Sequence, residues 1–190
     1  PDLGLLVVQD AETGEQVFVD THDRKFRKRF AAAAQRREAE LRTSFVQAGV
    51  DALELNLYRI ATDPETSSAQ IEQQVVDTVK AVKATVAIPV AVKLSPFFAG
   101  LAHLARELDR AGADGLVLFN RFYQPDIDPV DLCAVRALHL SDSSELLLRL
   151  HWMAILSGRV KASLAVTGGV HTALDVVKAT MAGAHVTPMV

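Results

Sequence analysis

A short phrase recurs along this chain of 190 residues and limits the folds that the chain can adopt. Ala48-Gly-Val-Asp-Ala-Leu-Glu-Leu55 returns as Ala111-Gly-Ala-Asp-Gly-Leu-Val-Leu118, and more weakly as Ala182-Gly-Ala-His-Val-Thr-Pro-Met189. In each copy, glycine suits the left-handed position that ends a helix, and an apolar run typical of a buried strand follows at once. Strands that alternate with helices in this way predict an α/β fold with a parallel sheet.

The pattern of apolar and polar residues predicts about five parallel strands with four helices between them. We expect the strands near 51–55, 90–94, 115–119, 164–167 and 185–189. We expect the helices near 67–84, 99–111, 145–157 and 171–182, and the cluster 141–144 is a good N-cap for the third. Residues 121–140 show no clear helix, and we weigh a functional loop equally against a surface insertion there.

The first fifty residues follow a different pattern, a β-hairpin and then a long helix. Apolar runs at 5–8 and 16–19 flank a polar turn, which is typical of a hairpin. A helix would then extend from about residue 21 to about residue 48, with a basic cluster at 24–29 near its start. Such a cluster can bind phosphates, but we favour a solvated helix face.

Composition narrows the classes of partner. The formal net charge of -3 leaves no basic footprint for nucleic acid, and no apolar stretch is long enough to span a membrane. The single cysteine, Cys133, rules out an internal disulfide and is interpreted as an inert loop thiol. We therefore expect a cytoplasmic protein that binds a small molecule, with no nucleic-acid or membrane partner.

Polar residues stand at the carboxyl ends of four of the predicted strands. Asn56, Lys93 and Asn120 end the first three, and Thr167-Gly168-Gly169 ends the fourth. Lysine is almost never fully buried without a partner, so Lys93 in its apolar strand requires an anionic or electron-rich neighbour. Because the carboxyl ends of parallel strands face one side, where ligands bind in α/β folds, these residues predict a ligand site.

The glycine pair opens the last predicted helix, which makes it a candidate phosphate cradle. Backbone N–H groups at a helix start attract anions, although an ordinary turn between strand and helix has the same composition. The histidines lack metal-ligand spacing, so no metal site is predicted. Glu145 and Arg149 are four residues apart and are interpreted as a pair that supports a helix surface.

From about residue 49 to 190 the chain resembles dihydroorotate dehydrogenase-like proteins, which are FMN-containing (β/α)8 TIM barrels. The segments that carry the resemblance are 51–56, 90–96, 112–120 and 167–170. The resemblance implies an oxidoreductase of pyrimidine biosynthesis, a flavoprotein in which a hydride passes from a small-molecule substrate to FMN.

The resemblance also implies roles for the residues at the strand ends. Lys93 would be catalytic, lying against the pyrimidine edge of the flavin and stabilising negative charge on the reduced ring. Asn120 would contact flavin or substrate, and Asn56 would hydrogen-bond the substrate. Thr167, Gly168 and Gly169 would bind the cofactor at its phosphate.

The chain departs from the family pattern in three ways. Arg59 stands where the family has its catalytic base, and arginine cannot deprotonate. The last residues, 187–190, lack a second glycine for the phosphate, and the first three barrel strands have no counterpart. The expected fold is thus a partial barrel of about five strands, preceded by the hairpin and helix.

These departures leave other functions open. The chain could be a non-catalytic, incomplete barrel with a structural or interaction role, or a barrel enzyme that forms a Schiff base on Lys93. An open sheet also exposes its inner face, so we expect a partner or a second copy to cover it.

Residues 1–50 resemble the C-terminal end of uncharacterised proteins with a von Willebrand factor A-like domain. The segments 3–15 and 30–38 carry this likeness. Our hypothesis is that the chain is a fusion or an assembly artefact, joined at residues 49–55.

Overall fold

The computed structural model describes the strands at residues 5–9 and 16–20, and then residues 50–57, 62–120, 126–135 and 140–188. The chain divides into two compact units, Pro1–Val50 and Asp51–Val190. In the first unit, β1 (Leu5–Gln9) and β2 (Gln16–Asp20) pair antiparallel, which confirms the predicted hairpin. The predicted long helix and its basic cluster lie outside the described residues.

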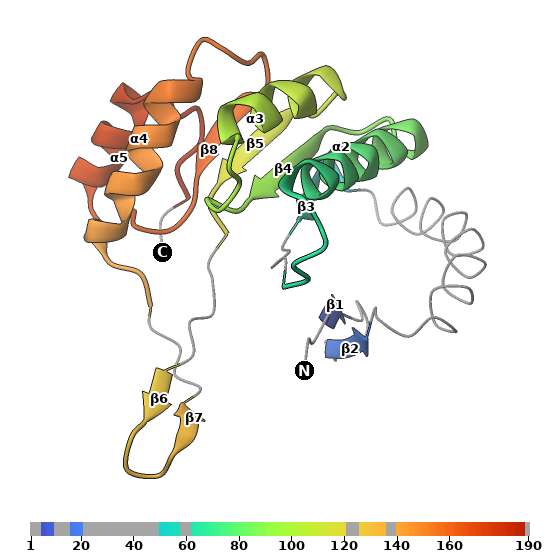
Figure 1. The fold of residues 1–190 in the computed structure, drawn as a ribbon. Helices are drawn as coiled ribbons and strands as arrows, with labels where there is room; N and C mark the ends of the chain where they lie inside the picture. The colour runs from blue at the N-terminus through green and yellow to red at the C-terminus, as the bar shows by residue number, and fades with distance from the viewer. Residues whose placement is uncertain are drawn as a thin grey trace. The chain divides into compact units, whose positions relative to one another are not determined.

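The second unit is built on a four-stranded parallel sheet (Figure 1). Its strands, in spatial order, are β3 (Leu53–Asn56), β4 (Val90–Leu94), β5 (Gly115–Leu118) and β8 (Ser163–Val166). The fifth predicted strand contributes a single parallel bridge from Val186 to Ala165. The α/β prediction is confirmed, and a parallel sheet alternating with helices is the architecture of part of a (β/α)8 barrel.

Four helices connect and cover the strands. They are α2 (Ser68–Thr85), α3 (Leu101–Arg110), α4 (Leu146–Leu156) and α5 (Ala173–Met181), each close to its predicted range. Ser67 begins α2 with a capping box, and Thr172 does the same for α5. Asp142, inside the predicted N-cap cluster, caps the short 3-10 turn η1 (Ser143–Glu145) that leads into α4.

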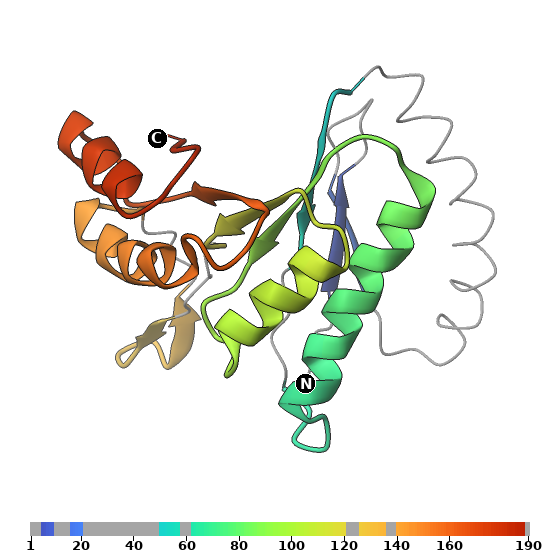
Figure 2. The ribbon, with the colours of Figure 1, turned by 90° about the horizontal axis from the view of Figure 1, so that it is seen from above.

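The core lies between the sheet and these helices (Figure 2). Along β4, Val90, Val92 and Leu94 are fully buried, whereas Ala91 and Lys93 between them are only half-buried. Strands as apolar as β4 are typically buried on both faces in parallel sheets, but in the described residues only the first face of β4 is fully buried. The helices pack against the first face, with Leu104, Leu108 and Met153 among the buried residues of the same cluster.

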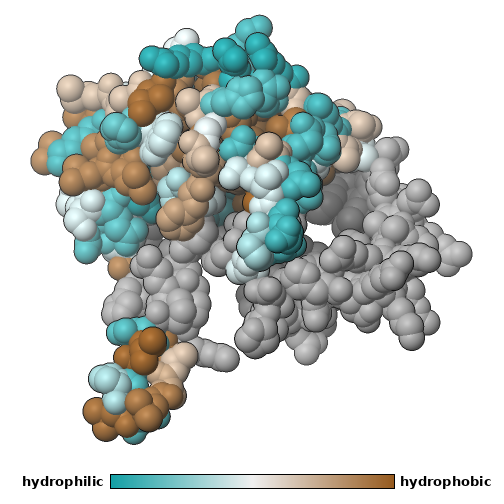
Figure 3. Space-filling model, in the orientation of Figure 1, coloured by the Kyte–Doolittle hydropathy of each residue, from teal (hydrophilic) through white to brown (hydrophobic). Residues whose placement is uncertain are grey.

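The region between β5 and α4 contains a second hairpin. β6 (Asp126–Asp128) and β7 (Cys133–Val135) pair antiparallel, and the described part of 121–140 contains no helix, as predicted. Cys133 is exposed and free. Ile127, Val130 and Leu132 are also exposed. In Figure 3 the hairpin shows brown, hydrophobic surface interspersed with teal.

Within the described residues, no helix is long and apolar enough to cross a membrane. The same part of the chain contains no group of three or more His, Cys, Asp or Glu side chains arranged to hold a metal ion.

Candidate functional site

Lys93 lies near the carboxyl end of β4 and faces the half-buried side of the sheet. Its Nζ is 3.2 Å from Oε1 of Glu54 on the neighbouring strand β3, and 24% of its side chain is exposed. The sequence predicted an anionic neighbour for this lysine but did not name Glu54. Parallel register supplies the missing information: Glu54 pairs with Ala91, two residues before Lys93, so both side chains point to one face.

Asn56 and Asn120 flank Lys93 on the two neighbouring strands. Asn56 is the register partner of Lys93, so its exposed side chain lies on the same face. Asn120 is buried directly after β5, where its Nδ2 donates to the Lys93 carbonyl at 3.4 Å and its backbone N donates to the Leu94 carbonyl at 2.7 Å. The structure therefore brings these three predicted site residues together at the carboxyl ends of neighbouring strands.

Thr167 continues this edge at the end of β8. Its backbone N donates to the Leu118 carbonyl at 2.7 Å, and its Oγ1 donates to the Phe119 carbonyl at 3.1 Å. These bonds fix the point at which the chain leaves the sheet. Gly168 and Gly169 follow with φ of 74° and 77°, a left-handed conformation that glycine adopts without steric cost.

The loop that follows Thr167 presents a run of backbone donors. The N–H groups of Gly168, Gly169 and Val170 have no acceptor among the described residues. The next two N–H groups, those of His171 and Thr172, donate to Oδ2 of Asp175 at 3.2 and 3.0 Å. A run of backbone N–H groups ahead of a helix start is an arrangement that commonly holds an anion.

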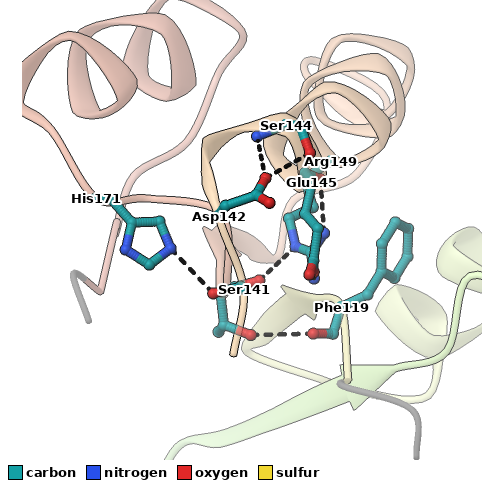
Figure 4. A network of polar contacts seen from close by, with 8 residues as sticks. Phe119, Ser141, Asp142, Ser144, Glu145, Arg149 and His171 are labelled. Atoms are coloured by element: carbon teal, nitrogen blue, oxygen red, sulfur yellow. Dashed lines mark hydrogen bonds and ion pairs between the residues drawn. The ribbon is translucent and has the colours of Figure 1, made fainter. Parts of the chain in front are cut away.

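The carboxylate of Asp175 fixes the start of α5 beside this loop. Besides the two N–H groups, it accepts hydrogen bonds from the hydroxyls of Ser143 at 2.7 Å and Thr172 at 2.9 Å. The Ser143 bond contributes most to lowering the pKa of Asp175 to about 2, and the donors at Thr172 and His171 add to it against the desolvation that raises it. On the same side, Ser141 Oγ lies 3.0 Å from Nε2 of His171 (Figure 4).

Arg149 is buried, so the predicted role as a surface pair with Glu145 is wrong. Only 6% of the residue is exposed. Its Nε donates to the Thr167 carbonyl at 2.5 Å and its Nη1 to the Glu145 carbonyl at 2.6 Å, while Nη2 lies 3.4 Å from the Glu145 carboxylate (Figure 4). The four-residue spacing correctly predicts that Glu145 and Arg149 lie close together. It does not show whether the pair faces solvent or the loop that follows β8, which we call the β8 loop.

Comparisons with known proteins match the chain in two ways. Residues 1–40 match a family model described as a protein of unknown function, DUF58. About seven tenths of the chain is similar to the catalytic subunit of dihydroorotate dehydrogenase B (NAD(+)). The protein from Shouchella clausii is 33% identical over 150 residues, covering 73% of this chain and 47% of the relative. The protein from Bacillus mycoides is 31% identical over 147 residues, covering 71% and 45%.

Two solved structures are also similar. A dihydroorotate dehydrogenase from Eimeria tenella, in complex with ferulenol, has a TM-score of 0.49 at 18% identity and covers 80% of this chain and 48% of its own. A mutant of mandelate oxidase has a TM-score of 0.46 at 19% identity, covering 79% and 44%.

The chain spans about half the length of the curated relatives that it matches. The resemblance of residues 1–50 to a von Willebrand factor A-like domain, and the fusion hypothesis, stay predictions. Over about seven tenths of its length, this chain is similar in sequence to catalytic subunits of dihydroorotate dehydrogenase B.

Proposed function

We propose that this chain is part of an FMN-dependent oxidoreductase that resembles dihydroorotate dehydrogenase and takes a hydride from a small molecule. One observation carries the proposal. The region that is 31–33% identical to dihydroorotate dehydrogenase B proteins folds so that Asn56, Lys93 and Asn120 meet at the carboxyl ends of neighbouring strands. This is the side of a parallel α/β fold on which ligands bind.

The residues at this edge fit the two polar ends of FMN. The N–H groups of residues 168–170, which have no acceptor in the described part of the chain, suit a phosphate. Lys93 offers a half-buried ammonium group to the electron-rich pyrimidine edge of a flavin. FMN, when bound, supplies a ring that accepts a hydride.

The chain's own residues would orient the substrate and hold charge. Asn56 is exposed on the face that Lys93 shares, so its amide is available to hydrogen-bond a substrate there. Asn120 is tied to the Lys93 carbonyl, which sets the spacing between the two strand ends. Glu54, at 3.2 Å, holds the ammonium of Lys93 on the open face of the sheet.

The proposal names a class of substrate and not a particular molecule. Arg59, which replaces the family's base, lies outside the described residues, and no guanidinium deprotonates at physiological pH. We therefore leave dihydroorotate and pyrimidine biosynthesis as predictions and propose only a small molecule with an oxidisable C–H bond. The same departure favours the second candidate, a non-catalytic partial barrel.

The Schiff-base alternative is less compatible with the structure. A Schiff base forms when the lysine nitrogen attacks a carbonyl carbon, and Nζ of Lys93 is already engaged by the Glu54 carboxylate at 3.2 Å. Borohydride trapping with a carbonyl substrate, followed by mass spectrometry, would reveal an adduct on Lys93 if this alternative were correct.

The proposed function predicts that the purified full chain binds FMN. We expect flavin absorbance in the purified protein, or saturable quenching of FMN fluorescence on titration. Lys93→Met should weaken binding about tenfold, because one charge-assisted contact is lost without loss of side-chain volume. Lys161→Met, at an exposed position, is the matched control. A colourless chain that takes up no added FMN would refute flavin binding.

The half-buried second face of the sheet also bears on assembly. Ala91, Lys93 and Gly115 remain partly accessible there. We propose that a partner or a second copy of the chain covers this face in solution. Sedimentation equilibrium over a range of protein concentrations would test for a second copy, and a monomer at all concentrations would argue against it.

A further inference from the structure

We propose that Arg149 is a positioning residue for the phosphate of FMN, acting from beneath the loop that follows β8. This inference rests on the proposed function, because it assigns a role to Arg149 at the same site. It predicts that Arg149 makes the chain prefer FMN over riboflavin, which has the same ring system and no phosphate.

Hydrogen bonds connect Arg149 to the start of the loop. Its Nε donates at 2.5 Å to the carbonyl of Thr167, the residue that immediately precedes Gly168. Its Nη1 donates at 2.6 Å to the Glu145 carbonyl in the turn before α4. One guanidinium therefore joins the carboxyl end of β8 to the amino end of α4, and the geometry of the loop depends on this fork.

Direct packing brings the same side chain against the first glycine. A Cβ on Gly168 would lie 2.9 Å from Nη2 of Arg149, so the guanidinium fills the space next to this glycine. Gly169 is equally close to the backbone of α4, with its hypothetical Cβ 2.6 Å from the Leu146 nitrogen. The loop thus rests on the first turns of α4.

The charge of Arg149 acts in the same direction as the loop N–H groups. Arginine is always protonated in proteins, and this one is 6% exposed. One ionic neighbour is the Glu145 carboxylate at 3.4 Å, whose side chain is 38% exposed and therefore more strongly screened by water. The Asp175 carboxylate on the other side is already paired with the N–H groups of His171 and Thr172. The Arg149 charge at the Gly168 end of the loop therefore adds to the loop N–H groups and favours a phosphate dianion over a neutral group.

Burial keeps the guanidinium from reaching a ligand on the far side of the loop. Arg149 therefore acts through the loop, and two roles must be separated. If Arg149 only supports the shape of the loop, a substitution at this position should weaken the binding of FMN and of riboflavin equally. If Arg149 acts on the phosphate, the substitution should weaken the binding of FMN alone.

The test compares both flavins with the wild-type chain, Arg149→Gln and Arg149→Lys. Dissociation constants are measured by fluorescence titration at fixed ionic strength. We expect Arg149→Gln to raise the dissociation constant for FMN about tenfold and to change that for riboflavin less than about twofold. Arg149→Lys keeps the charge but loses the fork, and we expect an intermediate rise of about threefold for FMN.

Arg159→Gln is the matched control, because Arg159 is an exposed cation just beyond α4. It should leave both constants unchanged. The inference is overturned if Arg149→Gln raises the dissociation constants for FMN and riboflavin by the same factor, or if it changes neither constant. If Arg149→Gln fails to fold, the same comparison of the two dissociation constants is made with Arg149→Lys.

Failure of the inference is distinguishable from failure of the proposed function. A wild-type chain that binds neither flavin refutes both. A wild-type chain that binds FMN and riboflavin equally refutes the phosphate preference, and Arg149 with it, but leaves flavin binding intact. A wild-type preference for FMN that survives Arg149→Gln refutes the role of Arg149 alone.

Discussion

Gly169→Ala should destabilise the chain far more than Gly158→Ala, although both glycines have positive φ. The two angles, 77° and 72°, carry a similar left-handed penalty of roughly 1–2 kcal/mol for any L side chain. A Cβ on Gly158 meets nothing within 4 Å, whereas a Cβ on Gly169 would lie 2.6 Å from the Leu146 nitrogen and 2.9 Å from its Cα. Backbone atoms of a helix cannot rotate away, so overpacking adds about 1–3 kcal/mol at Gly169 alone.

Urea unfolding of the full chain measures this difference. Trp152, the single tryptophan, lies in α4 and partly in the core, so its fluorescence reports on the helix that the new methyl group would displace. We expect Gly169→Ala to lower the free energy of unfolding by about 1–3 kcal/mol more than Gly158→Ala. Equal losses in the two variants would show that the β8 loop does not rest on α4 as described.

Two further predictions concern the core and the start of α5. Leu108→Ala, at a fully buried position, should cost about 2–5 kcal/mol of unfolding free energy by urea denaturation. Leu147→Ala, at a residue 68% exposed, should cost less than about 0.5 kcal/mol, and a large loss there would instead indicate that another surface covers Leu147. The pKa of Asp175 is lowered to about 2, so its carboxylate stabilises the fold above about pH 4 and this contribution is lost as the pH falls toward 2. Asp175→Asn should therefore flatten the acid dependence of stability between pH 4 and 2, and a slope identical to that of the wild type would contradict the assigned hydrogen bonds.

Local sequence patterns predicted the four helices, the four strands of the parallel sheet and the carboxyl ends of the strands that carry the site, but not the β6–β7 hairpin. The glycine after each helix, the apolar run that follows and the serine, threonine and aspartate caps are local signals, and α2–α5 lie close to their predicted ranges. Asn56, Lys93 and Asn120 were expected together because parallel strands end on one side, and the register confirms that they meet. The predicted fifth strand is reduced to the bridge at Val186.

The contacts between elements were beyond local patterns. Glu54 became the partner of Lys93 only through the register of β3 on β4, since 39 residues separate them. Spacing alone placed Arg149 on a helix surface, because a pair four residues apart looks the same on either face of a helix.

The sequence by itself determined the order of strands and helices and the residues that end each strand, because capping, periodicity and glycine conformation act over a few neighbours. The tertiary structure decided which face of the sheet is covered, which carboxylate meets Lys93 and that the guanidinium of Arg149 lies beneath the glycine loop. These depend on how the sheet, α4 and the β8 loop pack, and packing is a property of residues far apart in the chain.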